Sequence, residues 1–153
     1  MSALHLRTPL SNALRLLETR FRHEAIVTEV DVLDDLPPVW GAADQIEQIF
    51  LNVLVNAWHA MPEGGTIRVQ AGTADDVQSV WIAVRDSGTG ISPADLVRAF
   101  EPFYTTKKDK GTGLGLAMCR QIMDSHRGTI AIDSTLGEGT TLTMTFLPAE
   151  ASV

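Results

Sequence analysis

The chain has 153 residues, of which 44% are hydrophobic and 20% are charged. This composition excludes a disordered tail and a fibrous protein, and the length suits one domain built around a single core. The net charge of −7 argues against nucleic acid as the main partner, because phosphate contacts need clustered Lys and Arg.

Neither a membrane span nor a secretion signal is visible in the sequence. No run approaches the roughly 20 apolar residues of a bilayer-crossing helix, and the first residues lack a signal-peptide pattern. The single cysteine, Cys119, cannot form an internal disulfide, and its apolar helical surroundings favour a buried core side chain. We therefore expect a cytoplasmic domain without direct membrane contact, within a parent protein that could itself be membrane-anchored.

Hydrophobic periodicity predicts an alternation of helices and strands. In chain order the prediction is a helix at 9–22, a strand at 26–33, a helix at 42–61, strands at 66–71 and 77–85, a short helix at 93–99, a helix at 113–126 and strands at 129–134 and 140–147. Residues 100–112 are polar and irregular. Because several strands follow one another directly, we expect a mixed, mostly antiparallel sheet with helices on one face, a two-layer α/β sandwich.

The long helix at 42–61 carries a stripe of amides on an otherwise apolar surface. Gln48, Asn52 and Asn56 recur at intervals of four residues, so they share one face of the helix. Burying an amide without a partner costs about 1–3 kcal/mol. The partners are either the protein's own backbone or a ligand, and amide oxygens suit a hard cation such as the metal of a polyphosphate.

A predicted strand ends at Asp86, which is followed by Gly88 and Gly90. Glycines let a ligand approach the backbone closely. A carboxylate only accepts hydrogen bonds, so Asp86 would select a ligand edge with a donor, such as the amino group of adenine, over the carbonyl of guanine. Taken alone, this pattern is more typical of an ordinary turn.

A glycine-rich stretch at 111–115 opens the helix predicted over 113–126. Exposed backbone N–H groups at a helix N-terminus favour phosphates, although close packing also uses such glycines. The spacing matches neither the P-loop nor the dinucleotide fingerprint, and the motifs of serine/threonine protein kinases do not occur. Just upstream stand lysines that either meet phosphates or line a solvated loop: Lys107, Lys108 and Lys110.

Taken in order, these motifs resemble the ATP-binding domain shared by histidine kinases, gyrase, the Hsp90 chaperones and the MutL mismatch-repair proteins. The order is the amide-striped helix, the Asp86 loop, the stretch at 100–107 and the glycines at 111–115. Residues 47–57 and 102–107 resemble sensor histidine kinases of the nitrogen-regulation and dicarboxylate-sensing kind. The resemblance covers about residues 14–148 and implies the Bergerat-type ATP-binding fold.

What the resemblance implies is a site for ATP and Mg²⁺. Asn56 would coordinate Mg²⁺ with Asn52 assisting, Asp86 would bind the adenine amino group, and Thr140 would support Asp86 through water. Gly88 and Gly90 would let the base approach, and Phe100 and Phe103 would anchor the lid. The remaining implied ATP contacts are Lys107, Lys110, Gly111, Gly113, Leu114 and Gly115. Asn52, Asn56 and Lys107 would serve catalysis.

Two departures qualify this comparison. Hydrolysing relatives carry Glu where this chain has Asn52, and an amide is no general base, so γ-phosphate would survive for transfer. Many histidine kinases carry Lys where this chain has His59, which leaves a phosphate role for His59 open.

His5 lies in a stretch that looks like a phosphoacceptor motif but is out of register with it, since Leu4 occupies the place of the acceptor. An acceptor domain is a pair of long helices, which needs over about 50 residues. Only 35 residues separate His5 from Gly41. We expect residues 1–8 to be foreign to the domain or the end of a truncated upstream segment, and residues 9–153 to form the catalytic domain.

The predicted function is transfer of the ATP γ-phosphate to a histidine on missing dimerisation and phosphoacceptor helices, and from there to a response regulator. Alone, the domain is expected to be a monomer. The alternatives are a serine kinase of an anti-sigma factor, a nucleotide-hydrolysing switch and a degenerate interaction module without catalysis.

Overall fold

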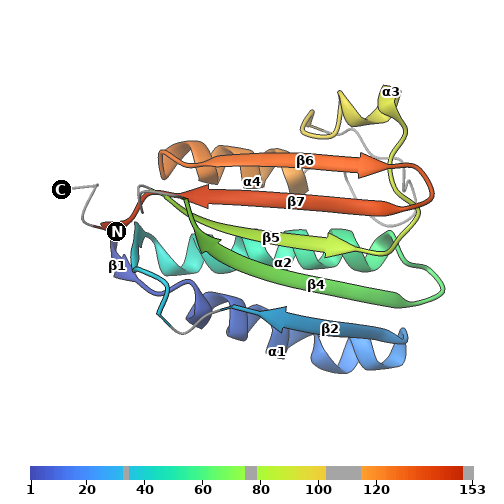
Figure 1. Cartoon of the computed structure of the whole chain (residues 1–153), viewed down its shortest axis with the longest axis horizontal. Coiled ribbons are helices and arrows are strands. Elements are labelled where there is room, and N and C mark those ends of the chain that lie inside the picture. The colour runs from blue at the N-terminus through green and yellow to red at the C-terminus, as the bar shows by residue number, and fades with distance from the viewer. Residues whose placement is uncertain (33–34, 75–78, 103–114, 150–153) are drawn as a thin grey trace.

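Five strands form the central sheet of the structure, a computed structural model that describes residues 1–32, 35–74, 79–102 and 115–149. In spatial order the strands are β2 (Ile26–Asp31), β4 (Gly65–Thr73), β5 (Val80–Asp86), β7 (Gly139–Phe146) and β6 (Thr129–Thr135). β2 runs parallel to β4, and every other neighbouring pair is antiparallel (Figure 1). The mixed, mostly antiparallel sheet is therefore confirmed.

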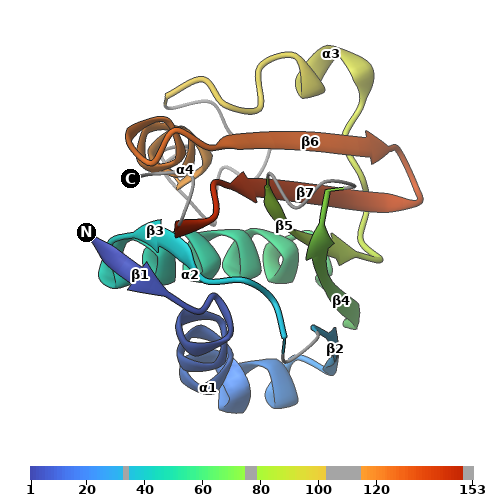
Figure 2. The ribbon, with the colours of Figure 1, turned by 60° about the vertical axis from the view of Figure 1, so that its left-hand side comes forward.

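The helices lie against one face of this sheet. These are α1 (Arg7–His23), α2 (Ala43–His59) and α4 (Gly115–Ser125). α2 lies in the middle and contacts both of the others, while the single turn α3 (Pro93–Leu96) lies beside β6 (Figures 1 and 2). The two-layer α/β sandwich follows directly from this arrangement.

The core is filled by the side of α2 that faces the sheet. Its buried residues recur at intervals of three and four, as an amphipathic helix requires: Ile46, Ile49, Phe50, Val53, Leu54 and Ala57. Alternate residues of β4 and β5 meet them from the sheet: Ile67, Val69, Val80, Ile82 and Val84. Full burial of side chains of this kind is worth about 1.5–3 kcal/mol each, which makes α2 the element that fixes the sheet.

Two short strands were not predicted. β1 (Ser2–Leu4) pairs antiparallel with β3 (Val39–Gly41), and Leu6 between β1 and α1 is buried. Three-residue strands are too short to show a periodicity, and their pairing depends on contacts distant in sequence. Residues 2–4 and 6 are thus attached to the fold by strand pairing and by burial of Leu6, whereas the boundary placed after residue 8 stays a prediction.

The predicted helix at 93–99 is too long. Its N-cap is Ser92, whose Oγ accepts from the Asp95 backbone N–H. After Leu96 the backbone bonds span three residues instead of four, as in Arg98 N–H to Asp95 O at 3.0 Å and Ala99 N–H to Leu96 O at 3.2 Å. The chain therefore leaves α3 in tighter turns.

α1 is followed directly by β2, so the described part of this region holds one helix and not a pair of acceptor helices. His5 is exposed ahead of α1. The structure thus agrees with the length argument made from the sequence.

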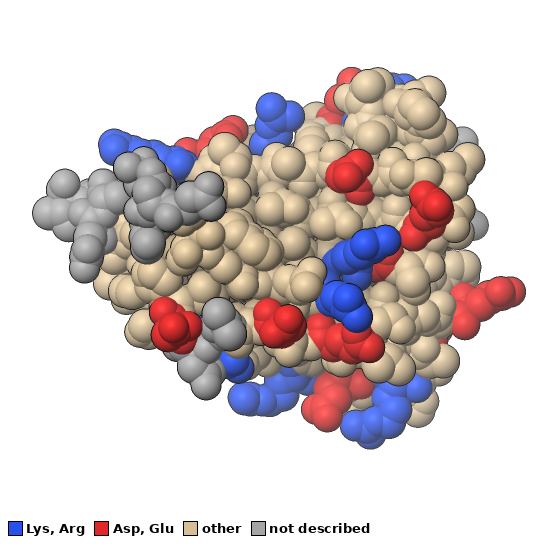
Figure 3. All heavy atoms as spheres, viewed as in Figure 1, with Lys and Arg blue, Asp and Glu red and all other residues tan. Residues whose placement is uncertain are grey.

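Among the described residues, no helix covers the second face of the sheet. Threonines of β7 and β6 line much of it, together with the Glu29–Arg68 ion pair at 3.0 Å between β2 and β4. Figure 3 shows acidic and basic side chains interspersed over this face, among uncharged atoms. Within the described residues, no helix combines the length and the hydropathy that a membrane crossing requires.

Candidate functional site

A buried carboxylate marks the end of β5. Asp86 is only 4% exposed, although it is the last residue of its strand. Its Oδ1 accepts a hydrogen bond of 2.8 Å from the backbone N–H of Gly88. This bond orients the carboxylate as the loop leaves the sheet. A buried carboxylate at the end of a strand is a candidate ligand-binding group.

The loop after Asp86 is fixed on one side to α2 and β4. The Thr89 N–H donates to Ala60 O at 3.0 Å, just beyond the end of α2. The Ser87 N–H donates to Thr66 O at 3.2 Å, and the Ser87 hydroxyl accepts from the Thr66 N–H at 3.0 Å. Gly88 fits here because a Cβ at that position would lie 2.4 Å from Ala60 O.

On its other side, the loop is fixed to the β6–β7 hairpin. Gly137 donates its N–H to Thr89 O at 2.7 Å, and the Ile91 N–H donates to Ser134 Oγ at 2.8 Å. The residues that follow Asp86 are therefore held by backbone bonds from three elements, which gives a ligand a preformed surface.

Thr140 is the cross-strand partner of Asp86 in the β5–β7 register, and it is 4% exposed. Ser134 Oγ donates to Gly139 O at 2.9 Å and lies 2.8 Å from Thr140 Oγ1. Since the serine hydrogen goes to Gly139, the Thr140 hydroxyl donates to Ser134. The Thr140 hydroxyl can then only accept a further hydrogen bond, and the Asp86 carboxylate also only accepts. A bridge between the two side chains therefore needs a donor between them, such as water.

Gly90 is required by the hairpin contact, and its substitution should destabilise the fold. Its φ is +72°, and a Cβ there would lie 2.2 Å from Thr135 O. Gly90→Ala should lower the free energy of unfolding by about 2–5 kcal/mol, from left-handed strain plus overpacking. Gly137 is a matched control, because its φ is +84° but a Cβ would meet nothing within 4 Å.

Gly137→Ala should cost only the strain, about 1–2 kcal/mol. Urea unfolding of both variants measures the difference. Equal losses for the two variants would contradict the close approach of Gly90 to β6.

The amide stripe of α2 lies next to α4. Gln48 is exposed, whereas Asn52 and Asn56 are half-buried. Gln48 Nε2 donates to Asn52 Oδ1 at 3.2 Å. Asn52 Nδ2 is buried and has no hydrogen-bond partner among the described residues. A helix that buries such a donor retains a polar group with unused capacity beside the predicted metal position.

Cys119 of α4 is fully buried against this stripe. Its thiol points at Ile49 O, with 3.8 Å between sulfur and oxygen. Burial raises the pKa of Cys119 to about 11 from 9.0, while the Asn52 amide acts in the opposite direction. The expected core position of Cys119 is confirmed, and the thiol stays protonated at neutral pH.

The raised pKa of Cys119 has a consequence for stability. Between pH 9 and about 11 the unfolded chain loses the thiol proton while the folded chain keeps it. Stability should therefore fall as pH rises through this window, by up to about 3 kcal/mol. Urea unfolding across the window, compared with Cys119→Ala, isolates the thiol. The same pH slope in both chains would contradict this effect.

Two further contacts hold α4 in place, one to the start of α2 and one to the segment that follows α3. His126 is 5% exposed and accepts at Nε2 from the Ala42 N–H at 3.0 Å, while its Nδ1 lies 2.8 Å from Ile122 O. Nδ1 therefore carries the proton. In the middle of α4, Arg120 lies over the partly buried ring of Phe100, at 5.5 Å from the ring centroid.

The profile of the family described as "Histidine kinase-, DNA gyrase B-, and HSP90-like ATPase" matches residues 41–151. The chain belongs to this family. The matched range includes Asn52, Asn56, Asp86 and Thr140, whose individual roles stay predictions.

The relatives of this ATPase domain are sensor kinases. The chain is 37% identical over 141 residues to sporulation kinase E of Bacillus subtilis. This alignment covers 92% of the chain and 19% of that kinase. The solved catalytic domain of the histidine kinase ThkA matches with a TM-score of 0.85 and 27% identity over 97% of both chains. Full-length ShkA in complex with AMPPNP matches with a TM-score of 0.84 and 27% identity, over 97% of this chain and 31% of that one.

These comparisons confirm the expected histidine kinase type of the ATPase domain. The chain spans about a fifth of the length of sporulation kinase E, so that relative carries further domains. The nitrogen-regulation and dicarboxylate-sensing subtype stays a prediction.

Several site residues expected from the sequence lie outside the described residues. They are Phe103, Lys107, Lys110, Gly111, Gly113 and Leu114. Gly115 is the first residue of α4. The structure brings the others to one end of the sheet: the end of β5, the second half of α2 and the start of β7.

Sequence reasoning missed the residues that hold this ATPase site in shape. Ser87 and Ser134 both accept a backbone N–H that fixes the Asp86 loop. Neither belongs to a motif. Only the strand register, which sets Ser134 opposite Thr140, could have indicated the second of them.

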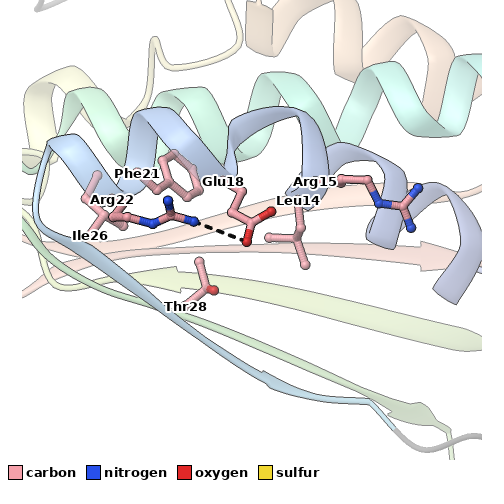
Figure 4. Close-up of a pocket in the computed structure, with 7 residues that line it drawn as sticks. All are labelled: Leu14, Arg15, Glu18, Phe21, Arg22, Ile26 and Thr28. Atoms are coloured by element: carbon pink, nitrogen blue, oxygen red, sulfur yellow. Dashed lines mark hydrogen bonds and ion pairs between the residues drawn. The ribbon is translucent and has the colours of Figure 1, made fainter.

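A hollow of about 400 Å³ lies apart from this site, between α1 and β2. Figure 4 shows Leu14, Phe21 and Ile26 around it, with the Arg22–Glu18 ion pair of 3.4 Å at its edge. None of the predicted nucleotide-binding residues lines it, so it takes no part in the site.

Proposed function

We propose that this domain binds ATP together with Mg²⁺ and transfers the γ-phosphate to a histidine on separate dimerisation and phosphoacceptor helices of its parent protein. A response regulator would then receive the phosphate. The observation that carries the proposal is the buried, oriented carboxylate of Asp86 in a chain homologous to sensor kinases.

Adenine recognition is assigned to Asp86. Because its carboxylate only accepts, it suits the amino group of adenine and opposes the carbonyl of guanine. The bond from the Gly88 N–H uses part of the capacity of Oδ1 and sets the direction of the carboxylate before a nucleotide arrives. Such preorganisation reduces the entropy lost on binding.

The described residues also fit Mg²⁺. Asn52 has its Nδ2 buried and its Oδ1 engaged by the exposed Gln48, so oxygen is the atom it turns outward. Asn56 follows one turn later on the same helix. Amide oxygens are suitable ligands for a hard cation. When bound, Mg²⁺ would supply charge neutralisation on the phosphates.

Asn52 also favours transfer over hydrolysis. An amide cannot take a proton from water at neutral pH, so the described part of the site offers no base at this position. The chain's contribution would be positioning: Asp86 would hold the base, and the amides of α2 would hold the polyphosphate end. Asn56, Asn52 and Lys107 remain the proposed catalytic residues, with Lys110 and the glycines at 111–115 on the phosphates.

Transfer of labelled phosphate tests this function. The domain is mixed with the separately produced phosphoacceptor helices of its parent and with ATP labelled at the γ-phosphate. We expect label on the helices that is lost in acid and kept in alkali, as a phosphoramidate of histidine is. Acid-stable, alkali-labile label would favour the serine kinase, and release of free phosphate would favour the hydrolysing switch. No label on well-folded partners would favour the non-catalytic module.

We further infer a cytoplasmic domain that is monomeric alone, with dimerisation supplied by the missing helices. The part of this inference that concerns the helices is supported by the lengths of the sensor-kinase relatives, of which this chain covers 19% and 31%.

A further inference from the structure

One side of α2 carries apolar residues that the rest of the domain covers only in part. Leu51 and Val55 are half-buried and stand one turn apart. They belong to the side of α2 that points away from the sheet, because fully buried residues such as Val53 and Ala57 lie on the opposite side. A surface helix is expected to carry polar side chains there. The packing of this domain therefore accounts for only part of their apolar surface.

The apolar surface continues from α2 onto α1. Trp58, three residues after Val55, is only partly buried, and the Arg20 guanidinium lies over its ring at 5.4 Å from the centroid. Phe21 meets the same ring edge-on, with 6.5 Å between the ring centroids. Leu16 stands one turn before Arg20 on the same face of α1 and is 66% exposed.

The two helices run side by side in the same direction (Figures 1 and 2). Since Arg20 of α1 lies at the level of Trp58 of α2, Leu16 lies beside the turn of α2 that precedes Trp58. The result is one exposed surface on the outside of the helix layer. We call it the α1–α2 face, and it consists of Leu16, Arg20, Leu51, Val55 and Trp58.

This α1–α2 face borders the proposed metal position. Leu51 and Val55 immediately precede Asn52 and Asn56, so the apolar stripe and the amide stripe lie next to each other along α2. An atom that accepts a phosphoryl group must come within about 3–3.5 Å of it. A helix that carries such an acceptor therefore has to pass close to α2, where the α1–α2 face offers apolar contact.

We propose that the α1–α2 face docks the phosphoacceptor helices of the parent protein through an apolar stripe on one of them. The identity of this occupant rests on the proposed function. The groove between two neighbouring helices suits the ridge of a third one, and Trp and Arg are enriched among the residues that carry most binding energy at interfaces. The chain spans only 19% of sporulation kinase E, so that relative has ample further chain to supply such helices.

Leu16→Gln tests the docking through the kinetics of transfer. The change removes an exposed apolar side chain and keeps a good helix former, so the fold should be unaffected. With the separately produced phosphoacceptor helices of the parent as substrate, their KM should rise about three- to tenfold. The kcat at saturating helices and the affinity for ATP should stay unchanged, because Leu16 is not part of the nucleotide site.

Val27→Gln is the matched control. Val27 is 59% exposed and points to the second face of the sheet, since its neighbours Ile26 and Thr28 line the hollow beneath α1. It loses a similar amount of exposed aliphatic surface on the other layer of the domain. The KM for the helices should therefore stay unchanged in Val27→Gln.

An NMR titration without nucleotide separates docking from chemistry. Backbone amide signals of the labelled domain are followed while the unlabelled phosphoacceptor helices are added. Signals of the α1–α2 face should shift in a saturable way, whereas those of β2 should not. Leu16→Gln should raise the Kd obtained from these shifts by the same factor as the KM.

The two readouts distinguish the possible failures. An unchanged KM in Leu16→Gln overturns the inference, and so does an equal rise in Val27→Gln. Shifts confined to other surfaces, or no shifts at all, overturn it as well. If the unaltered domain binds no ATP or transfers no phosphate, the proposed function fails, and the NMR titration still decides whether the α1–α2 face docks the helices.

Discussion

Asp86→Asn should weaken ATP binding by about ten- to a hundredfold, because a hydrogen bond to a buried charged acceptor would be lost. The substituted amide keeps an oxygen for the Gly88 N–H, which bonds to Oδ1 at 2.8 Å. Its new NH₂ group would meet the amino group of adenine, donor against donor. The effect thus falls on the base and leaves the loop in place.

The same change should alter base selectivity. An amide can donate to the carbonyl of guanine, so GTP should lose less affinity than ATP does. Competition titrations of both nucleotides measure this ratio. Asp133→Asn is a control with the same chemistry on an exposed strand position, and it should change neither affinity. Equal losses for ATP and GTP would contradict direct reading of the base by Asp86.

Asn56→Ala should weaken the dependence of nucleotide binding on Mg²⁺ by at least about tenfold, by removing an oxygen ligand. Asn56 is half-buried on α2, one turn after Asn52, and its backbone oxygen accepts from the Ala60 N–H at 3.1 Å. That backbone bond survives the change to Ala, which also favours the helix. The end of α2 should therefore keep its place beside the loop.

A titration of Mg²⁺ at fixed ATP measures this effect, and phosphoryl transfer should fall in parallel. Metal-free ATP should bind Asn56→Ala as it binds the unaltered domain, since Asp86 is unchanged. Gln45→Ala on the exposed side of α2 is the control for helix changes. An unaltered Mg²⁺ titration in Asn56→Ala would remove Asn56 from the metal site.

Much of the fold could be predicted because its elements are long and regular. α2 shows one apolar face over 17 residues, and the antiparallel strands β6 and β7 are joined by a short turn. β1 and β3 could not be predicted, because each has three residues and their pairing joins segments far apart in the chain. The end of α3 was also missed, since it depends on local turns that no periodicity records.

The candidate site likewise has features that the sequence could predict and features that it could not. Asp86 and Gly88 are near in sequence, so their relation was visible as a motif, and the bond between them is present. The attachment of the loop to the β6–β7 hairpin depends on strand register and was not visible. Cys119 was correctly placed in the core, yet its neighbour Asn52 belongs to another helix, so only the packing of α4 on α2 revealed the contact.

The most direct test of the account is a calorimetric titration of this domain with ATP, with and without Mg²⁺. We predict saturable binding in the micromolar to millimolar range, tighter with Mg²⁺ and much weakened in Asp86→Asn. Absence of saturable binding by a domain that unfolds cooperatively on heating would contradict a nucleotide site at Asp86 and the kinase function built on it.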